Sequence, residues 1–359
     1  MTLFKEIENF FEPSPLSFMR VVPFNKIIFD QRCEFLCKYG CKNYRRKYCC
    51  PPDSLKLAQQ IKKRKFRWAL LAATSFPLPE KISVFKKRNL NRQKELEIQR
   101  ISTSLDSLFK KNGIEHIVLS GGACKKCKIC SKQENLACKK PDEKLTSMEA
   151  VGIDCQRTLT SAGFDFEMPA INSINRCTTI LFDDENDLSS INWKNKESYQ
   201  FLKKIKKEEI QLACKKLLEE NSKMFNSIEL ISIKDINRRS NICDDPCAHY
   251  SSNFSCPPYS NKINLQLWDN CILWSWRKNT SKKNSYNQAL RKVHTTIFSL
   301  GLYFAFSVRD CFCDECSSCE YALNDSPICN YRKIMAPSMQ SQDIDPLQFG
   351  EDKFGLEFI

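Results

Sequence analysis

Cysteine is the residue type of this sequence with the widest chemistry, and the chain of 359 residues contains 21 cysteines against three histidines. Each half contains a run Cys-x2-Cys-x2-Cys. Thiolates spaced in this way can face one point inside a tight loop, as in the opening triplet of bacterial ferredoxins. With the cysteine that follows each run, the predicted ligand sets are Cys124, Cys127, Cys130 and Cys138 in the first half and Cys313, Cys316, Cys319 and Cys329 in the second.

The four-cysteine sets favour an iron–sulfur cluster of the 4Fe–4S type over zinc. Tetrahedral zinc usually takes one Cys-x2-Cys pair from each of two segments, so the third cysteine of the run would be superfluous to it. We therefore expect closed clusters that pass single electrons, with zinc as the alternative cofactor. Inert thiols are a further alternative, because a buried cysteine also serves as a small apolar side chain.

A second pattern, Cys-x3-Cys-x8-Cys-Pro-Pro, also occurs twice. Three thiolates would hold a cubane by three irons and leave the fourth iron open as a Lewis acid or for substrate binding. The predicted ligands are Cys37, Cys41 and Cys50 in the first half and Cys243, Cys247 and Cys256 in the second. Additional candidate ligands nearby are Cys33, Cys311 and His249.

The repetition of both patterns indicates an internal duplication. The three-cysteine pattern recurs at a shift of 206 positions with every spacing kept. We place the boundary near residue 190, in the polar and turn-rich segment 183–196. The chain is thus predicted to contain a first cysteine-rich metal-binding repeat over 1–190 and a second, degenerate one over 191–359.

The segments between the motifs indicate an α/β fold, with two tandem related α/β domains that carry the cysteines on loops. Short apolar runs predict strands at 27–29, 68–73, 114–119, 178–182, 228–233, 271–276 and 302–308. Helical spacing predicts helices at 55–65, 93–111, 197–224 and 287–300. Gly113 is expected to end the second of these helices. Thr146-x-x-Glu149 is a capping box, which predicts the start of another helix there.

The net charge of +14, from 56 Lys and Arg against 42 Asp and Glu, would suit an acidic protein or a nucleic acid as partner. The basic runs at 61–67, 86–94 and 203–207 lack the interleaved aromatic residues of a base-stacking surface. We therefore expect an acidic ferredoxin or flavodoxin-like electron donor in preference to nucleic acid.

The sequence gives no sign of export or of a membrane span. The N-terminal residues lack the apolar core of a signal peptide. The most apolar stretch, 68–79, is shorter than the roughly 20 residues that cross a bilayer. We expect a cytoplasmic protein without membrane contact, whose thiols are available for metals or redox chemistry in a reducing compartment.

The motifs resemble an uncharacterised cysteine-rich family of predicted metal-binding proteins, a domain of unknown function. The resemblance rests on Cys50-Pro51-Pro52, on 122–130 (Gly-Ala-Cys-x2-Cys-x2-Cys), on Cys138-x2-Pro141 and on 147–154 (Ser-Met-Glu-Ala-x-Gly-Ile-Asp). The second half keeps much of this signature but departs from it at Gln340, Ser341 and Asp343. The resemblance implies metal binding and no particular reaction.

Three classes of function stay open at this point. An enzyme would reduce or sulfurate an unidentified small molecule at the open iron of the three-cysteine set. A non-catalytic electron carrier or maturation partner would use closed clusters only. A zinc-binding structural or nucleic-acid-interaction module is the third class. No catalytic residue is identified, since nucleophilic-triad, phosphate-loop and dinucleotide motifs are absent.

Overall fold

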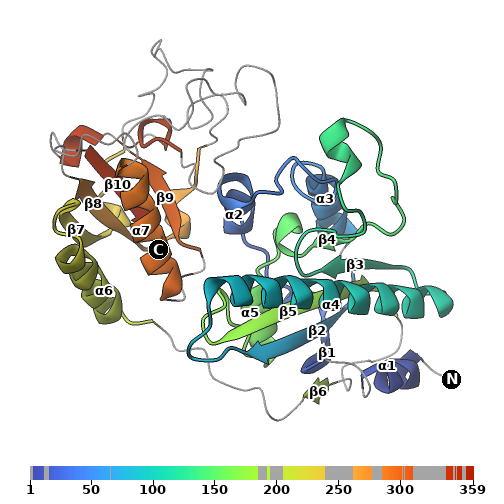
Figure 1. The fold of residues 1–359 in the computed structure, drawn as a ribbon. Helices are drawn as coiled ribbons and strands as arrows, with labels where there is room; N and C mark the ends of the chain where they lie inside the picture. The colour runs from blue at the N-terminus through green and yellow to red at the C-terminus, as the bar shows by residue number, and fades with distance from the viewer. Residues whose placement is uncertain are drawn as a thin grey trace. The chain divides into compact units, whose positions relative to one another are not determined.

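The computed structural model describes residues 3–11, 16–64, 66–184, 192–194, 205–238, 262–276, 285–300, 302, 304–309, 337–342, 344, 346–349 and 353–359. The chain divides into two compact units, shown in Figure 1. Unit 1 comprises Met1–Cys37 and Asn43–Lys203, and unit 2 comprises Lys38–Lys42 and Lys204–Ile359. The predicted boundary near residue 190 lies outside the described residues and stays a prediction.

Unit 1 is built on a six-stranded sheet with the order β4-β3-β5-β2-β1-β6. All pairings are antiparallel except that of β3 with β4. The strands are β1 Phe18–Pro23, β2 Trp68–Pro77, β3 His116–Ser120, β4 Thr146–Ser147, β5 Ser173–Phe182 and β6 Asn192–Lys194. The helices of unit 1 are α1 Leu3–Phe11, α3 Ser54–Arg64, α4 Val84–Lys111 and α5 Cys155–Ser161, and α2 covers Arg32–Gly40.

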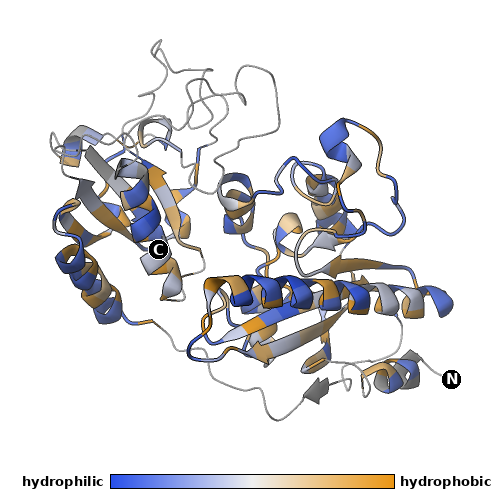
Figure 2. Cartoon of the chain, in the orientation of Figure 1, coloured by the Kyte–Doolittle hydropathy of each residue, from blue (hydrophilic) through white to orange (hydrophobic). Residues whose placement is uncertain are grey.

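Both faces of this sheet are buried, and β2 shows why. Ala69, Leu71 and Ala73 belong to one apolar cluster, in which residues of α3 and α5 pack on the sheet. The residues between them, among them Leu70 and Ala72, belong to a second cluster with residues of α1 and α4. Because both clusters exclude water, β2 reads in sequence as a continuous apolar run. Figure 2 shows the apolar strands and the alternation of hydrophilic and hydrophobic residues along α4.

Unit 2 contains a four-stranded antiparallel sheet with the order β7-β8-β10-β9. Its strands are β7 Phe225–Ser232, β8 Asn270–Trp276, β9 Phe306–Arg309 and β10 Lys353–Phe358, and its helices are α6 Lys207–Glu220 and α7 Ser285–Ser299. The apolar core of unit 2 contains residues of α6, α7, β7 and β8. Trp274 on β8 lies across Gly355 on β10, where a Cβ atom would come within 2.1 Å of the indole ring.

The two units share one strand order, which is the structural sign of the duplication. Reading β9, β10, β8 and β7 in place of β3, β5, β2 and β1 gives the same sequence of neighbours. The parallel pairing of β3 with β4 has its counterpart in a parallel bridge between Arg309 and Ser338. The isolated bridge between Phe29 and Ile153 corresponds to that between Arg238 and Ile344. The predicted mixed α/β class with two related domains is confirmed.

Several predicted elements are confirmed with longer bounds, and others are wrong. The helix predicted at 93–111 begins at Val84, and it ends before Gly113, which has a left-handed φ of 69°. The strand predicted at 27–29 is reduced to the single bridge at Phe29, because the backbone N–H of Ile28 donates to Thr158 Oγ1 instead of to a neighbouring strand.

Besides β4, which is described below, three strands at or near sheet edges escaped prediction. These are β1, in which the charged Arg20 interrupts the apolar run, the short β6, and β10. The helix predicted at 197–224 is described from Lys207 to Glu220. Its end is early because Asn221 caps it, with the side-chain amide donating to Leu217 O at 2.8 Å. Among the described residues, no helix has the length and apolar character needed to cross a membrane.

His294 on α7 should make the stability of unit 2 depend on pH. Burial lowers its pKa, but the charge and hydrogen bond of Glu357, whose carboxylate lies 2.7 Å from Nδ1, raise the pKa above its ordinary value overall. A raised pKa in the folded state means stabilisation that is complete below the ordinary pKa of about 6.5 and is lost as the pH rises through the folded-state pKa.

We therefore expect His294→Gln to lower the free energy of unfolding at about pH 5.5 and to have a smaller effect at about pH 9. Chemical denaturation of the full chain, followed by tryptophan fluorescence at both pH values, measures the difference. An equal effect at the two pH values would contradict the assignment.

Candidate metal centre

The first-half cysteine run lies on the loop between β3 and β4, residues 121–145, which we call the cysteine loop. It leaves the sheet at Gly121, where a Cβ atom would come within 2.8 Å of Cys177 O on the neighbouring β5. Gly122 follows with a left-handed φ of 79°, a conformation that glycine adopts without strain. The two glycines thus turn the chain out of the sheet just before Cys124.

A pocket lies between the cysteine loop and residues 47–49, which precede α3. It contains about 390 Å³ of space without protein atoms, part of it open to solvent. Five thiols line it, those of Cys49, Cys124, Cys127, Cys130 and Cys138. Four lysines line it as well, namely Lys47, Lys126, Lys140 and Lys144. We call this the cysteine pocket. All four first-half cysteines of the predicted four-cysteine set therefore lie around one space.

Gln99 on α4 fixes the inner end of the cysteine loop. Its side chain is 5% exposed, and its amide donates from Nε2 to Ala123 O at 3.0 Å and accepts at Oε1 from the backbone N–H of Lys125 at 3.0 Å. One turn further along α4, Thr103 Oγ1 accepts from Lys126 Nζ at 2.9 Å. The long helix α4 thereby positions the residues on both sides of Cys124.

Residues 47–53 hold the loop from the opposite side. Lys47 Nζ donates to Cys124 O at 2.6 Å, and the hydroxyl of Tyr48 donates to Leu136 O at 2.8 Å. Asp53 forms a short ion pair with Lys132. Two segments far apart in the sequence are thus tied together directly at the pocket.

Cys49 has an environment that favours its thiolate. A hydrogen bond with the thiol of Cys50, at a sulfur–sulfur distance of 3.8 Å, lowers its pKa, and so do the backbone N–H of Cys124 and the charge of Lys47. These effects outweigh burial, so that the pKa of Cys49 is lowered to about 7. At neutral pH a large share of Cys49 is therefore the anionic form that binds metals.

The predicted three-cysteine set is distributed differently. Cys50 packs with Cys49, Ala123 and Cys124 in one apolar cluster, next to the cysteine pocket. Cys37 lies on α2, and Cys41 directly follows that helix. An open-iron site on Cys37, Cys41 and Cys50 stays a prediction.

Cys33, proposed as an additional ligand, is 1% exposed on α2. Burial raises the pKa of its thiol strongly, and the nearby Glu149 and Asp154 raise it further. Cys33 is therefore protonated in the metal-free chain. Within the described residues, no three His, Cys, Asp or Glu side chains are arranged to hold a single metal ion.

The second-half candidates lie outside the described residues. They are Cys243, Cys247, His249, Cys256, Cys311, Cys313, Cys316, Cys319 and Cys329.

The predicted capping box at Thr146 is wrong. Thr146 and Ser147 form strand β4, and Ser147 Oγ accepts from the backbone N–H of Ala150, which begins only a short turn. The helix starts later, at Cys155, where Asp154 Oδ1 accepts from the N–H of Arg157 at 2.9 Å. The Thr-x-x-Glu pattern is present in the sequence, but Thr146 pairs with the edge of β3 and therefore lies in the sheet instead of capping a helix.

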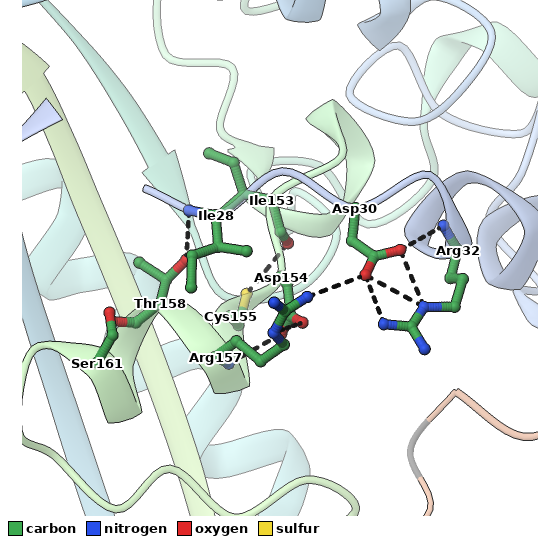
Figure 3. Close-up of polar contacts among 9 residues, drawn as sticks. All are labelled: Ile28, Asp30, Arg32, Ile153, Asp154, Cys155, Arg157, Thr158 and Ser161. Atoms are coloured by element: carbon green, nitrogen blue, oxygen red, sulfur yellow. Dashed lines mark hydrogen bonds and ion pairs between the residues drawn. The ribbon is translucent and has the colours of Figure 1, made fainter. Parts of the chain in front are cut away.

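Residues 147–154 hold the turn before α3 and the segment before α2 together. Ser54 Oγ donates to Ala150 O at 2.6 Å, and the N–H of Asp154 donates to Ile28 O at 2.9 Å. Figure 3 shows Asp30 between two guanidinium groups, those of Arg32 and Arg157, at 2.6 and 3.4 Å. This part of the family-like signature therefore has a structural role.

Sequence reasoning missed Cys49 and Gln99 as site residues. Cys49 stands outside the duplicated pattern, and its only signal was its position next to Cys50. Gln99 gave no signal, because a glutamine in a helix is usually solvated. A buried amide with both of its polar groups bonded is recognised only once the loop is in place.

Gln99→Leu should destabilise unit 1 by about 1–3 kcal/mol, because it leaves the carbonyl of Ala123 and the N–H of Lys125 buried without partners. Gln93→Leu, at an exposed position of the same helix, is the matched control and should change the free energy of unfolding little. Denaturant titration compares the two variants, and equal losses would contradict the role assigned to Gln99.

Asp154→Ala should cost about 1 kcal/mol through loss of the helix cap, whereas Asp154→Asn keeps a cap. Burial raises the pKa of Asp154, so the wild-type protein loses stability as the pH rises through the folded-state pKa of this carboxyl group. The stability of Asp154→Asn relative to wild type should therefore improve from acid to neutral pH. Thermal or denaturant unfolding measures the two stabilities. A stability of Asp154→Asn that falls relative to that of wild type over this pH range would refute this account.

Comparison with known proteins bears on the chain as a whole. A family model described as predicted metal-binding protein (DUF2284) matches residues 20–182 and 226–352, one stretch in each half. Searches of curated proteins and of solved structures each return no match. Because the two matched stretches cover most of the chain, the protein belongs to the DUF2284 family of predicted metal-binding proteins, with its domain present twice.

Proposed function

We propose that the cysteine pocket binds an iron–sulfur cluster of the 4Fe–4S type and that the protein is a redox protein working as an electron carrier. The observation that carries the proposal is the convergence of all four cysteines of the first-half set on one pocket. Four thiolates can close a cluster, and a closed cluster is suited to electron transfer.

The residues of the pocket fit such a cluster. Thiolates are the ligands of iron–sulfur clusters, and five cysteines line the pocket. Each iron of a cubane takes its own thiolate, so the ligand sulfurs lie further apart than they would around one ion.

The chain's own groups would set the electrostatics at the site. A cluster bound here would accept and release single electrons. Of the described residues that line the pocket, four are lysines and none is acidic, which favours a negatively charged group inside it. Hydrogen bonds to ligand sulfurs and the degree of solvent exposure tune the reduction potential of such sites.

The same lysines support the proposed partner. An acidic ferredoxin or flavodoxin-like donor would be attracted to a rim formed by residues such as Lys140 and Lys144, and such attraction mainly raises the rate of association. Reducing conditions in the cytoplasm would keep the thiols available and are part of the proposal.

Cys127→Ser should lower the iron and labile sulfide content of anaerobically purified protein by about one cluster, because it removes a ligand from the pocket. Cys214→Ser is the control, since Cys214 is a buried cysteine in the apolar core around α6. Iron, sulfide and zinc analysis with absorbance spectra of both variants measures the effect.

Colourless wild-type protein with stoichiometric zinc, and no reconstitution with iron and sulfide, would refute the cluster. An equal loss of iron in both variants would refute its assignment to this pocket.

A further inference from the structure

Cys49 is the one thiol of the cysteine pocket that does not belong to the duplicated pattern. The shift of 206 positions that relates Cys50 to Cys256 relates Cys49 to Ser255. Its presence is therefore a property of the first half alone. A lone cysteine could be a small apolar side chain, so its surroundings have to decide its role.

The depth of Cys49 sets it apart from the four motif cysteines. Cys49 is 1% exposed, whereas Cys124, Cys127, Cys130 and Cys138 are all partly exposed. Cys50, its neighbour in sequence, is also buried but does not line the pocket. Cys49 thus belongs to the buried inner wall of the pocket, while the motif cysteines surround its more open part.

The backbone around Cys49 is arranged as in a ligand site. The N–H of Cys124 donates to Cys49 Sγ at 3.3 Å, and Lys47 Nζ holds the carbonyl of the same Cys124. Hydrogen bonds of this kind orient metal-ligating side chains and stabilise the charge on the sulfur. They also link Cys49 directly to the first cysteine of the predicted ligand set.

We propose that Cys49 is a thiolate ligand of the metal in the cysteine pocket, so that the first-half site offers five thiols, of which a cubane or a tetrahedral thiophilic ion takes four, Cys49 among them. The inference rests on the proposed function in so far as the pocket binds metal, and it does not depend on that metal being a cluster. With serine at the corresponding position, the second half lacks this ligand.

Binding of Co²⁺ to the anaerobic, metal-free full chain tests the proposal. Cobalt bound by thiolates has a sulfur-to-metal charge-transfer absorbance that rises with the number of thiolates around the ion. Cys49→Ser should weaken the binding of one Co²⁺ equivalent at least tenfold in competition with a chelator, and should lower the absorbance per bound ion. Cys214→Ser, at a buried cysteine of α6 in unit 2, is the matched control and should change neither.

Cys49→Ala provides a second variant should the serine disturb folding, which circular dichroism monitors. In wild-type protein, Co²⁺ should also slow the alkylation of Cys49 by N-ethylmaleimide by a larger factor than that of Cys214, as peptide mass spectrometry measures. Unchanged affinity and absorbance in the folded Cys49 variants, or equal protection of the two cysteines, would overturn the proposal.

The cobalt result and the iron result separate the two proposals. Loss of Co²⁺ binding in the Cys49 variants, with no cluster formed in wild type, would support the ligand and refute the cluster. A wild-type cluster that the Cys49 variants retain, with unchanged Co²⁺ binding, would do the reverse. Wild-type protein that binds neither metal would refute both.

Discussion

The close approach of Gly121 to β5 is the constraint on which the candidate metal centre depends. There is no room for a Cβ atom beside the carbonyl of Cys177, so only glycine fits at position 121, where the chain leaves β3. The left-handed Gly122 then directs the chain toward α4, where Gln99 bonds the backbone on both sides of Cys124. The sheet, the helix and the loop therefore share one fixed point, and the cysteines are arranged from it.

The pocket combines two kinds of element with different stiffness. Its inner wall comes from residues 47–49 and the start of the cysteine loop, which are buried and joined by hydrogen bonds from Lys47 and Cys124. Its outer part comes from the more exposed residues 127–144, held by contacts such as that of Tyr48 with Leu136. A rigid inner wall with an adaptable outer loop is a suitable arrangement for taking up a metal after folding.

The duplication preserved the fold more faithfully than the site. Strand order and even the isolated bridges recur in unit 2, because a sheet with a buried face tolerates few rearrangements. The residues that begin the cysteine loop did not recur, because Asp310 and Cys311 occupy the positions of Gly121 and Gly122. Likewise, Ser255 occupies the position of Cys49. Loops carry function and vary more readily than the elements that support them.

The sequence by itself determined the duplication, the mixed α/β class and the grouping of the first-half four-cysteine set, because spacing and periodicity are local properties. The sequence predicted a helix cap at Thr146, which is wrong. A capping pattern contains the same residues whether or not the backbone pairs with a neighbouring strand. Only the tertiary structure decided that residues 47–49 meet the cysteine loop, that Gln99 is a buried clamp and that Cys49 belongs to the pocket. These are contacts between residues 24 to 88 positions apart in the sequence, and they follow from packing against the sheet, which no local pattern records.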